Sequence, residues 1–213
     1  MTVTQIVDSA RNNLNALTDT LWTDSELYVN LYKVMLKVAR KTRCIQAQPS
    51  ANTVAATSDY TMATTVNEIT RVTYAGAKLQ YIDRRQLDSI NPSSTTSSGT
   101  PAYYLVRGRT VTLYPTPSAV GAYIIYSNDI PSAIPTAATT LEIPTAYHDV
   151  LVDGLTSMMC PKDLGNPLTD TWQAAFNRGM AEMEADIKKK RRGDRFAIVQ
   201  VEENSLNTEF GII

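Results

Sequence analysis

The sequence predicts an α+β protein: helices from both ends of the chain form a bundle, an antiparallel β module is inserted between them, and an extended C-terminal arm follows. Apolar residues recur at three- and four-residue spacing near both ends, which is typical of amphipathic helices. This periodicity is absent from about residue 46 to residue 142, where short β-favouring runs alternate with Ser, Thr, Pro and Gly. We therefore expect a helical domain of residues 1–45 and 143–193, a β module of residues 46–142 and an arm of residues 194–213.

The composition suits a globular protein without a global attraction to polyanions. The 213 residues are 43% hydrophobic, which is enough to bury a core. Lys and Arg total 20 against 21 for Asp and Glu, so the net charge of -1 disfavours a dedicated DNA-binding or membrane-surface protein. No stretch reaches the roughly 18 apolar residues of a membrane span, and no basic segment leads into an apolar one at the N-terminus. We expect a soluble protein made in a cytoplasm.

Two helices are expected before the β module. The first covers about residues 3–17, and the second covers about residues 24–42. Thr23 is the expected N-cap of the second helix, with Glu26 as its reciprocal partner and Trp22 packed against Leu27. Cations near the end of this helix complement its dipole, with a subunit or nucleic-acid contact as the alternative; they are Lys37, Arg40, Lys41 and Arg43.

The β module is expected to hold five or six strands, enough for a small sandwich or open barrel. One hairpin pairs residues 69–74 with 79–82 around Gly76, which supplies the positive φ of a tight turn. A second pairs residues 103–106 with 110–114, reverses near Gly108 and ends at two prolines. A further strand covers residues 122–126. The Ser- and Thr-rich residues 91–98 are expected to form an exposed loop tip.

Two helices are expected after the β module. One follows Pro144 and covers about residues 145–159, with Gly154 at a close helix crossing. The other begins at Asn166 as N-cap and Pro167 as first residue, and it ends near residue 192 because Gly193 is a natural C-terminal cap. The residues expected in or beside the helical core are Trp22, Leu31, Val150, Leu155, Trp172 and Phe176.

Two stretches near the C-terminus are candidate interaction sites. The arm is more apolar than a solvated terminus usually is, so it packs on its own domain, docks on a partner chain or stays loose, and docking on a partner chain is the hypothesis we favour. The expected docking residues are Phe196, Ile198, Val199, Val201, Phe210, Ile212 and Ile213. The basic run before the arm is either a solvated helix end or a surface that contacts DNA or a neighbouring subunit; its members are Lys188, Lys189, Lys190, Arg191 and Arg192.

The sequence offers no motif for catalysis, a metal or a cofactor, and we expect no enzyme activity. Cys44 and Cys160 lack the spacing of a disulfide framework or a zinc site and are interpreted as buried hydrophobic residues. His148 is interpreted as a surface or capping residue; a hydrolase would use it with Asp149 or Asp153. The other alternative is a carbohydrate-binding or adhesin module, which would expose an aromatic cluster on one β face: Tyr103, Tyr104, Tyr114, Tyr123 and Tyr126.

The order and spacing of several short motifs resemble the head-to-tail adaptor (connector) proteins of tailed bacteriophages, particularly short-tailed ones. The motifs span most of residues 1–192: Ala10-Arg11 with Leu14, Leu21-Trp-Thr-Asp-Ser-Glu-Leu27, Val72 with Tyr74 and Leu79, Gly99-Thr-Pro-Ala-Tyr103, Val111-Thr-Leu-Tyr-Pro-Thr-Pro117, and Ile143-Pro-Thr-Ala-Tyr-His148.

This resemblance implies a structural virion protein that is assembled in the host cytoplasm and located in the neck. Family members form a dodecameric ring beneath the portal protein, continue the DNA channel, and offer a platform to the tail nozzle and often to tail fibres. The helices would make the ring body, and the C-terminal segment would reach toward the portal. Double-stranded DNA would pass through the ring without specific binding.

Overall fold

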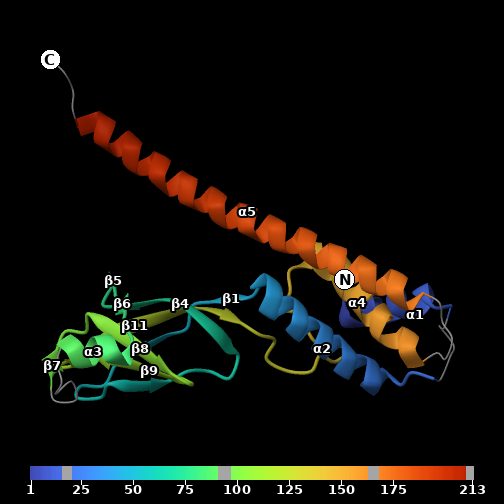
Figure 1. Cartoon of the computed structure of the whole chain (residues 1–213), viewed down its shortest axis with the longest axis horizontal. Helices are drawn as coiled ribbons and strands as arrows, with labels where there is room; N and C mark the ends of the chain where they lie inside the picture. Colours follow the sequence, from blue (N-terminus) through green and yellow to red (C-terminus); the bar gives the residue numbers. More distant parts are fainter. Residues whose placement is uncertain (16–20, 91–96, 163–167, 210–213) are drawn as a thin grey trace. The chain divides into compact units, whose positions relative to one another are not determined.

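The computed structural model describes the backbone of residues 1–15, 21–90, 97–162 and 168–209, and the side chains of this part except at positions 90, 162 and 192–209. The chain divides into two compact units (Figure 1). One is helical and joins Met1–Cys44 to Ile134–Ile213; the other is a β unit of Ile45–Ala133. The α+β class expected from the sequence is confirmed.

The helical unit is built around its most buried helix. Its helices are α1 (Val3–Asn13), α2 (Asp24–Thr42), α4 (His148–Met159) and α5 (Thr169–Glu209), with short 3-10 turns at Thr145–Tyr147 and Cys160–Lys162. Helix α4 packs against α1, α2 and α5, and most of its side chains are buried. Because α4 is apolar around most of its circumference, it needs partners on several sides.

Reciprocal caps begin both N-terminal helices. The Thr23 hydroxyl accepts a hydrogen bond from the Glu26 amide at 3.3 Å, and the Glu26 carboxylate accepts one from the Thr23 amide at 3.1 Å. Thr2 and Gln5 make the same arrangement at α1. Each box satisfies amide groups that have no partner inside the helix, which stabilises the helix start. The cap predicted at Thr23 is confirmed.

The helical core contains the expected residues, with one of them at its edge. Trp22, Leu31, Val150, Leu155 and Phe176 are buried. Trp172, in the first turn of α5, is only half-buried. The predicted N-cap and first residue of this helix, Asn166 and Pro167, lie outside the described residues.

Gly154 marks the close helix crossing predicted from the sequence. A Cβ atom there would lie 2.6 Å from Val34 Cγ1 of α2 and 2.8 Å from Phe176 Cε2 of α5. Real Cβ atoms do not approach other atoms so closely, so the absence of a side chain lets three helices meet at this point.

Replacement of Gly154 by Leu is therefore expected to overpack the core and to lower the free energy of unfolding by about 3 kcal/mol. Ala174→Leu is the matched control, because Ala174 is exposed on α5 and can accept the same added atoms. Urea unfolding of both variants measures the difference. Equal stability of the two variants would show that α2, α4 and α5 do not meet at Gly154.

Helix α5 continues through the residue that was expected to end it. It passes Gly193 and extends to Glu209, so the expected extended arm is helical up to that residue. A glycine inside a helix costs only about 1 kcal/mol relative to alanine, and the Lys, Arg and Ala residues around it favour helix. The prediction of a helix end at Gly193 is wrong.

Two of the three sheets that the structure describes in the β unit share a core. The first has the order β1-β11-β4-β5, with β2 also paired to β11; the second has the order β3-β9-β8-β6. The strands of the first sheet are β1 (Gln46–Ala47), β2 (Ser50–Asn52), β4 (Val66–Tyr74), β5 (Ala77–Lys78) and β11 (Ala122–Asp129). Those of the second are β3 (Asp59–Thr61), β6 (Gln80–Tyr81), β8 (Tyr103–Arg107) and β9 (Thr110–Tyr114).

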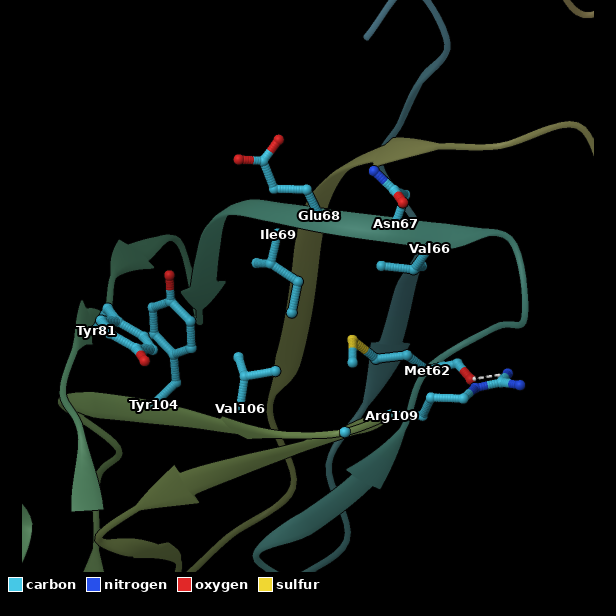
Figure 2. Close-up of a pocket in the computed structure, with 10 residues that line it drawn as sticks. Met62, Val66, Asn67, Glu68, Ile69, Tyr81, Tyr104, Val106 and Arg109 are labelled. Carbon is cyan, nitrogen blue, oxygen red and sulfur yellow. Dashed lines mark hydrogen bonds between the residues drawn. The ribbon is translucent and has the colours of Figure 1, made fainter. Parts of the chain in front are cut away.

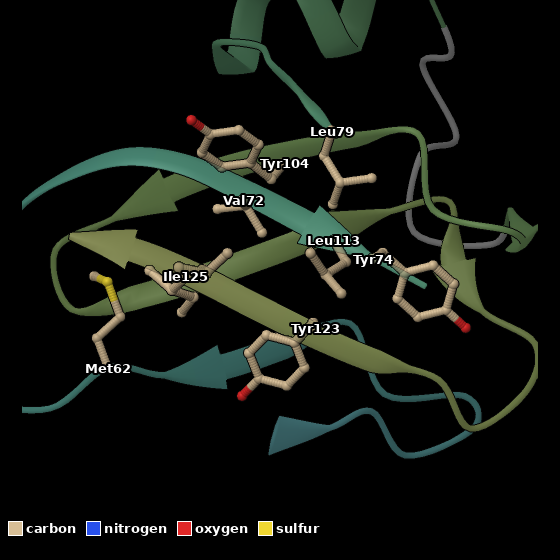
Figure 3. Packing of buried hydrophobic residues seen from close by; sticks show 9 residues of the cluster. Met62, Val72, Tyr74, Leu79, Tyr104, Leu113, Tyr123 and Ile125 are labelled. Atoms are coloured by element: carbon tan, nitrogen blue, oxygen red, sulfur yellow. The ribbon is translucent and has the colours of Figure 1, made fainter. Parts of the chain in front are cut away.

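Side chains from both sheets form the apolar core of this unit (Figure 3). Val72, Tyr74, Tyr123 and Ile125 come from the first sheet. Tyr104, Val111 and Leu113 come from the second, and Met62 and Leu79 complete the cluster from the segments beside the strands. This arrangement is a sandwich, one of the two forms that were expected from the sequence.

The hairpin predicted around Gly108 is confirmed, and the other one is confirmed in part. Strands β8 and β9 pair from Tyr103 opposite Tyr114 to Arg107 opposite Thr110. Strand β4 turns at Ala75 and Gly76 and pairs with β5. The chain then leaves this sheet at the buried Leu79, and β6 pairs in parallel with β8 instead. The module is therefore not purely antiparallel.

Two short elements near the predicted loop tip were not expected. Helix α3 (Arg84–Ile90) follows Asp83, whose carboxylate accepts a hydrogen bond from the Gln86 amide at 2.7 Å. Strand β7 (Ser98–Gly99) pairs in parallel with β10 (Thr116–Pro117), so the end of the predicted tip is a strand. The rest of that tip, residues 91–96, lies outside the described residues.

Candidate interaction surfaces

Carboxylates one helical turn before the basic run of α5 form ion pairs with two of its lysines. Lys188 forms an ion pair with Glu184 at 2.6 Å, and Lys190 forms one with Asp186 at 2.9 Å. The hydrogen bond from Lys188 lowers the pKa of Glu184. Such exposed pairs contribute little to stability, but they cancel much of the positive field of the run.

Two contacts attach this run to the rest of the helical unit. The Tyr147 hydroxyl donates a hydrogen bond to Asp186, and this bond, followed by the one from Lys190, lowers the pKa of that carboxyl. Arg191 donates a hydrogen bond at 2.8 Å to the carbonyl oxygen of Arg43, the left-handed residue that caps α2. Lys188, Lys190 and Arg191 therefore have partners within the chain, and Lys189 is exposed.

The predicted docking residues lie at the far end of α5. The backbone at Phe196, Ile198, Val199 and Val201 is helical, whereas Phe210, Ile212 and Ile213 lie outside the described residues. At 1.5 Å per residue the 41 residues of α5 span about 60 Å, roughly twice the length of the 19-residue α2. The helix is thus much longer than the helices of its own unit that it packs against.

An acidic groove lies between α4 and α5. Its volume is about 360 Å³, and Val150, Gly179 and Met183 form part of its apolar lining. Its charged lining comprises four carboxylates and one guanidinium: Asp149, Asp153, Glu182, Asp186 and Arg178. Burial raises the pKa of Asp153, and the neighbouring Asp149 raises it further, whereas Arg178 opposes the shift. The negative charge of the groove is therefore only partly compensated within the chain.

A second hollow, of about 380 Å³, opens between the two sheets of the β unit (Figure 2). Met62, Val66, Ile69, Tyr104 and Val106 line it with apolar groups. Figure 2 shows these side chains converging on the space between β4 and β8. Asn67, Glu68 and Arg109 belong to the lining, but the side chains of Asn67 and Glu68 point away from this space.

The polar groups of this cleft are engaged in the structure of the β unit. Arg109 donates a hydrogen bond to the Met62 carbonyl oxygen at 3.0 Å, and Glu68 accepts one from Asn128 at 3.0 Å. These groups hold loops and strands together. The cleft is suited to receiving an apolar group rather than to polarising a substrate.

His148 is a core residue, so its interpretation as a surface or capping residue is wrong. Only 3% of it is exposed, and its Nε2 atom lies 2.9 Å from the carbonyl oxygen of Ile143. The turn at Pro144 folds that carbonyl back toward the first turn of α4. Asp149 and Asp153 lie instead on the acidic groove. The structure therefore does not favour the hydrolase alternative built on these three residues.

The tyrosines of the carbohydrate-binding alternative do not form one exposed face. Tyr104, Tyr114 and Tyr123 are buried, and Tyr103 and Tyr126 are half-buried. Tyr123 and Tyr126 belong to β11 of the first sheet, whereas the others belong to the second sheet. The alternation of side chains directs three of them into cores of the β unit.

The remaining expectations concern cysteines, metals and membranes. Cys160 is buried as expected, Cys44 is half-buried, and no disulfide joins them. Within the described ranges, no group of three or more His, Cys, Asp or Glu side chains is placed to hold a metal ion. A search of the same residues finds no helix with the length and apolar character needed to cross a bilayer.

The described surfaces of this chain include charged helix faces, an apolar cleft and a long terminal helix. A family model described as SU10 adaptor protein matches residues 1–201, so the chain belongs to this family of phage head-to-tail adaptor proteins and has a structural role. The resemblance to phage head-to-tail adaptor proteins is thereby confirmed. No curated protein matches the chain significantly.

Proposed function

We propose that copies of this chain form a ring between the portal and the tail of a phage virion, continue the DNA channel, and dock tail components below. The main support for the proposal is the family match over residues 1–201, which covers the β unit and most of the helical unit. Twelve copies are expected from the resemblance, with the tail nozzle and tail fibres as further partners. The ring lies in the virion neck after assembly in the host cytoplasm.

The two units take different roles in this proposal. The helical domain, residues 1–45 and 143–193, forms the ring body, because neighbouring ring subunits need complementary, rigid surfaces, and the packing of α2 and α5 on α4 gives a rigid body that can carry them. The β module, residues 46–142, offers its apolar cleft to a tail protein. The far end of α5 docks on the portal through Phe196, Ile198, Val199, Val201 and the terminal apolar residues.

The charge distribution supports passage of DNA rather than tight binding. The net charge is -1, and Lys188 and Lys190 are paired with carboxylates one turn away. A channel lined by many unpaired cations would retain DNA through counterion release. The basic run from Lys188 to Arg192 therefore has only a moderate positive field. It lies at the channel or at a contact between subunits.

Sedimentation of the purified chain with portal rings of the same virus tests this function. We expect the chain to sediment with the portal at a fixed ratio of subunits, because a closed ring has a defined number of sites. The control is a mixture of the same portal rings with a tail-fibre protein of an unrelated phage, which is expected not to sediment with them. Absence of any complex with the portal over a wide range of concentrations would contradict the proposal.

A further inference from the structure

The exposed face of α2 is a stripe of positive charge. Lys33, Lys37, Arg40 and Lys41 are exposed and follow one another at intervals of four, three and one residues, which places them on one side of a helix. The opposite side carries the buried residues that pack against the rest of the unit, including Leu31, Val34, Met35 and Val38. None of the four cations forms an ion pair within the part of the chain that the structure describes. We name these four residues the basic stripe.

The acidic groove between α4 and α5 is its electrostatic complement. Asp186 is paired with Lys190, but Asp149, Asp153 and Glu182 form no ion pair among the described residues. The raised pKa of Asp153 shows that desolvation and a neighbouring carboxylate act there against the charged form. A cation entering the groove would compensate both effects.

The two surfaces lie on different sides of the helical unit. Successive residues of α5 are rotated by about 100° around its axis. Glu182 and Asp186 therefore lie about half a turn away from Glu184 and Arg191, which interact with the C-terminal end of α2. The basic stripe and the acidic groove of one chain thus face different neighbours.

We propose that the basic stripe of one subunit docks on the acidic groove of a second copy, and that this head-to-tail contact repeats around the ring. The inference rests on the proposed ring function and names the surfaces through which the ring closes. Two different, complementary faces on one chain generate a heterologous contact, which closes into a ring when the rotation per subunit allows it. Opposite charges on the two faces would also select the correct orientation of neighbouring subunits.

Charge reversal on each face separately tests the contact. The variant Lys33→Glu/Arg40→Glu reverses the stripe, and Asp149→Lys/Glu182→Lys reverses the groove; all four residues are exposed, so both variants are expected to fold. Each variant alone places like charges opposite each other and is expected to weaken ring assembly on portal rings by roughly 100-fold or more. The control Lys78→Glu/Arg85→Glu reverses two exposed cations of the β unit and should assemble normally.

Mixing the two reversed variants tests directly whether the stripe and the groove contact each other. The reversed stripe of one variant then meets the reversed groove of the other, and the native stripe meets the native groove, so an alternating ring should form. Sedimentation velocity with portal rings measures the recovery, and circular dichroism confirms that each variant is folded. Unimpaired assembly of either single-face variant, or no recovery in the mixture, would overturn the interface but not the ring. A wild-type chain that never assembles, alone or with the portal, would overturn both.

Discussion

Replacement of Phe176 by Ala is expected to lower the free energy of unfolding by about 3–5 kcal/mol, the largest loss expected for a single side chain of this protein. Phe176 is 2% exposed and lies where α5 crosses α2 and α4. Lys37 Nζ lies 4.9 Å from the centre of the Phe176 ring, which adds a cation–π contact. Truncation to Ala would leave a cavity among three helices, because none of them can move inward without losing other contacts.

Chemical denaturation followed by circular dichroism measures this effect. The control is Trp172→Ala, which removes a larger side chain from a half-buried position and is therefore expected to cost less than Phe176→Ala. The sequence predicts both residues in or beside the core, so their side-chain sizes alone would give the larger loss to Trp172. A greater loss at Trp172 than at Phe176 would show that the core lies nearer the start of α5 than the structure indicates.

Deletion of residues 196–213 is expected to abolish or greatly weaken binding to portal rings while the rest of the chain stays folded. The described core of the helical unit ends before this segment; Met183 is its last buried apolar residue. Thermal unfolding should therefore change little, and circular dichroism should lose only the signal of the removed helical residues. Wild-type affinity of the shortened chain for the portal would refute the docking role of the C-terminal segment.

Gly193→Pro is a companion variant for that experiment, because it keeps every proposed docking residue. Proline inside a helix costs about 3 kcal/mol and bends or breaks the helix. If docking uses α5 as one continuous helix, this variant should also bind the portal weakly. Normal binding by Gly193→Pro together with loss of binding by the deletion would indicate that the segment docks independently of the helix before it.

Local signals in the sequence were sufficient for helix starts, one hairpin and one helix crossing. Thr23 and Glu26 form a cap through residues three positions apart, and Gly108 lies in a tight turn, so both features are encoded within a few residues. Gly154 could be predicted because a glycine on an apolar helix stripe has few uses other than close packing. Helix α3 could have been found by the same reasoning, since Asp83 and Gln86 form a capping box of their own.

Features that depend on distant parts of the chain were not predictable from spacing. The crossing of the chain between sheets at Leu79 is decided by the pairing of β6 with β8, more than twenty residues later. His148 is buried because the Ile143 carbonyl reaches it through a turn that the sequence does not specify. The acidic groove joins Asp149 and Asp153 of α4 to Glu182 of α5, and only the packing of the two helices brings them together.

Electron microscopy of the chain mixed with portal rings tests whether the chain forms a ring between portal and tail. We expect a second ring, coaxial with the portal, with an open channel and one copy of the chain at each equivalent position. Images of portal rings without the chain serve as the reference that identifies the added density. Portal rings decorated by isolated or irregularly placed copies, without a closed ring, would rule out the proposed ring-forming adaptor.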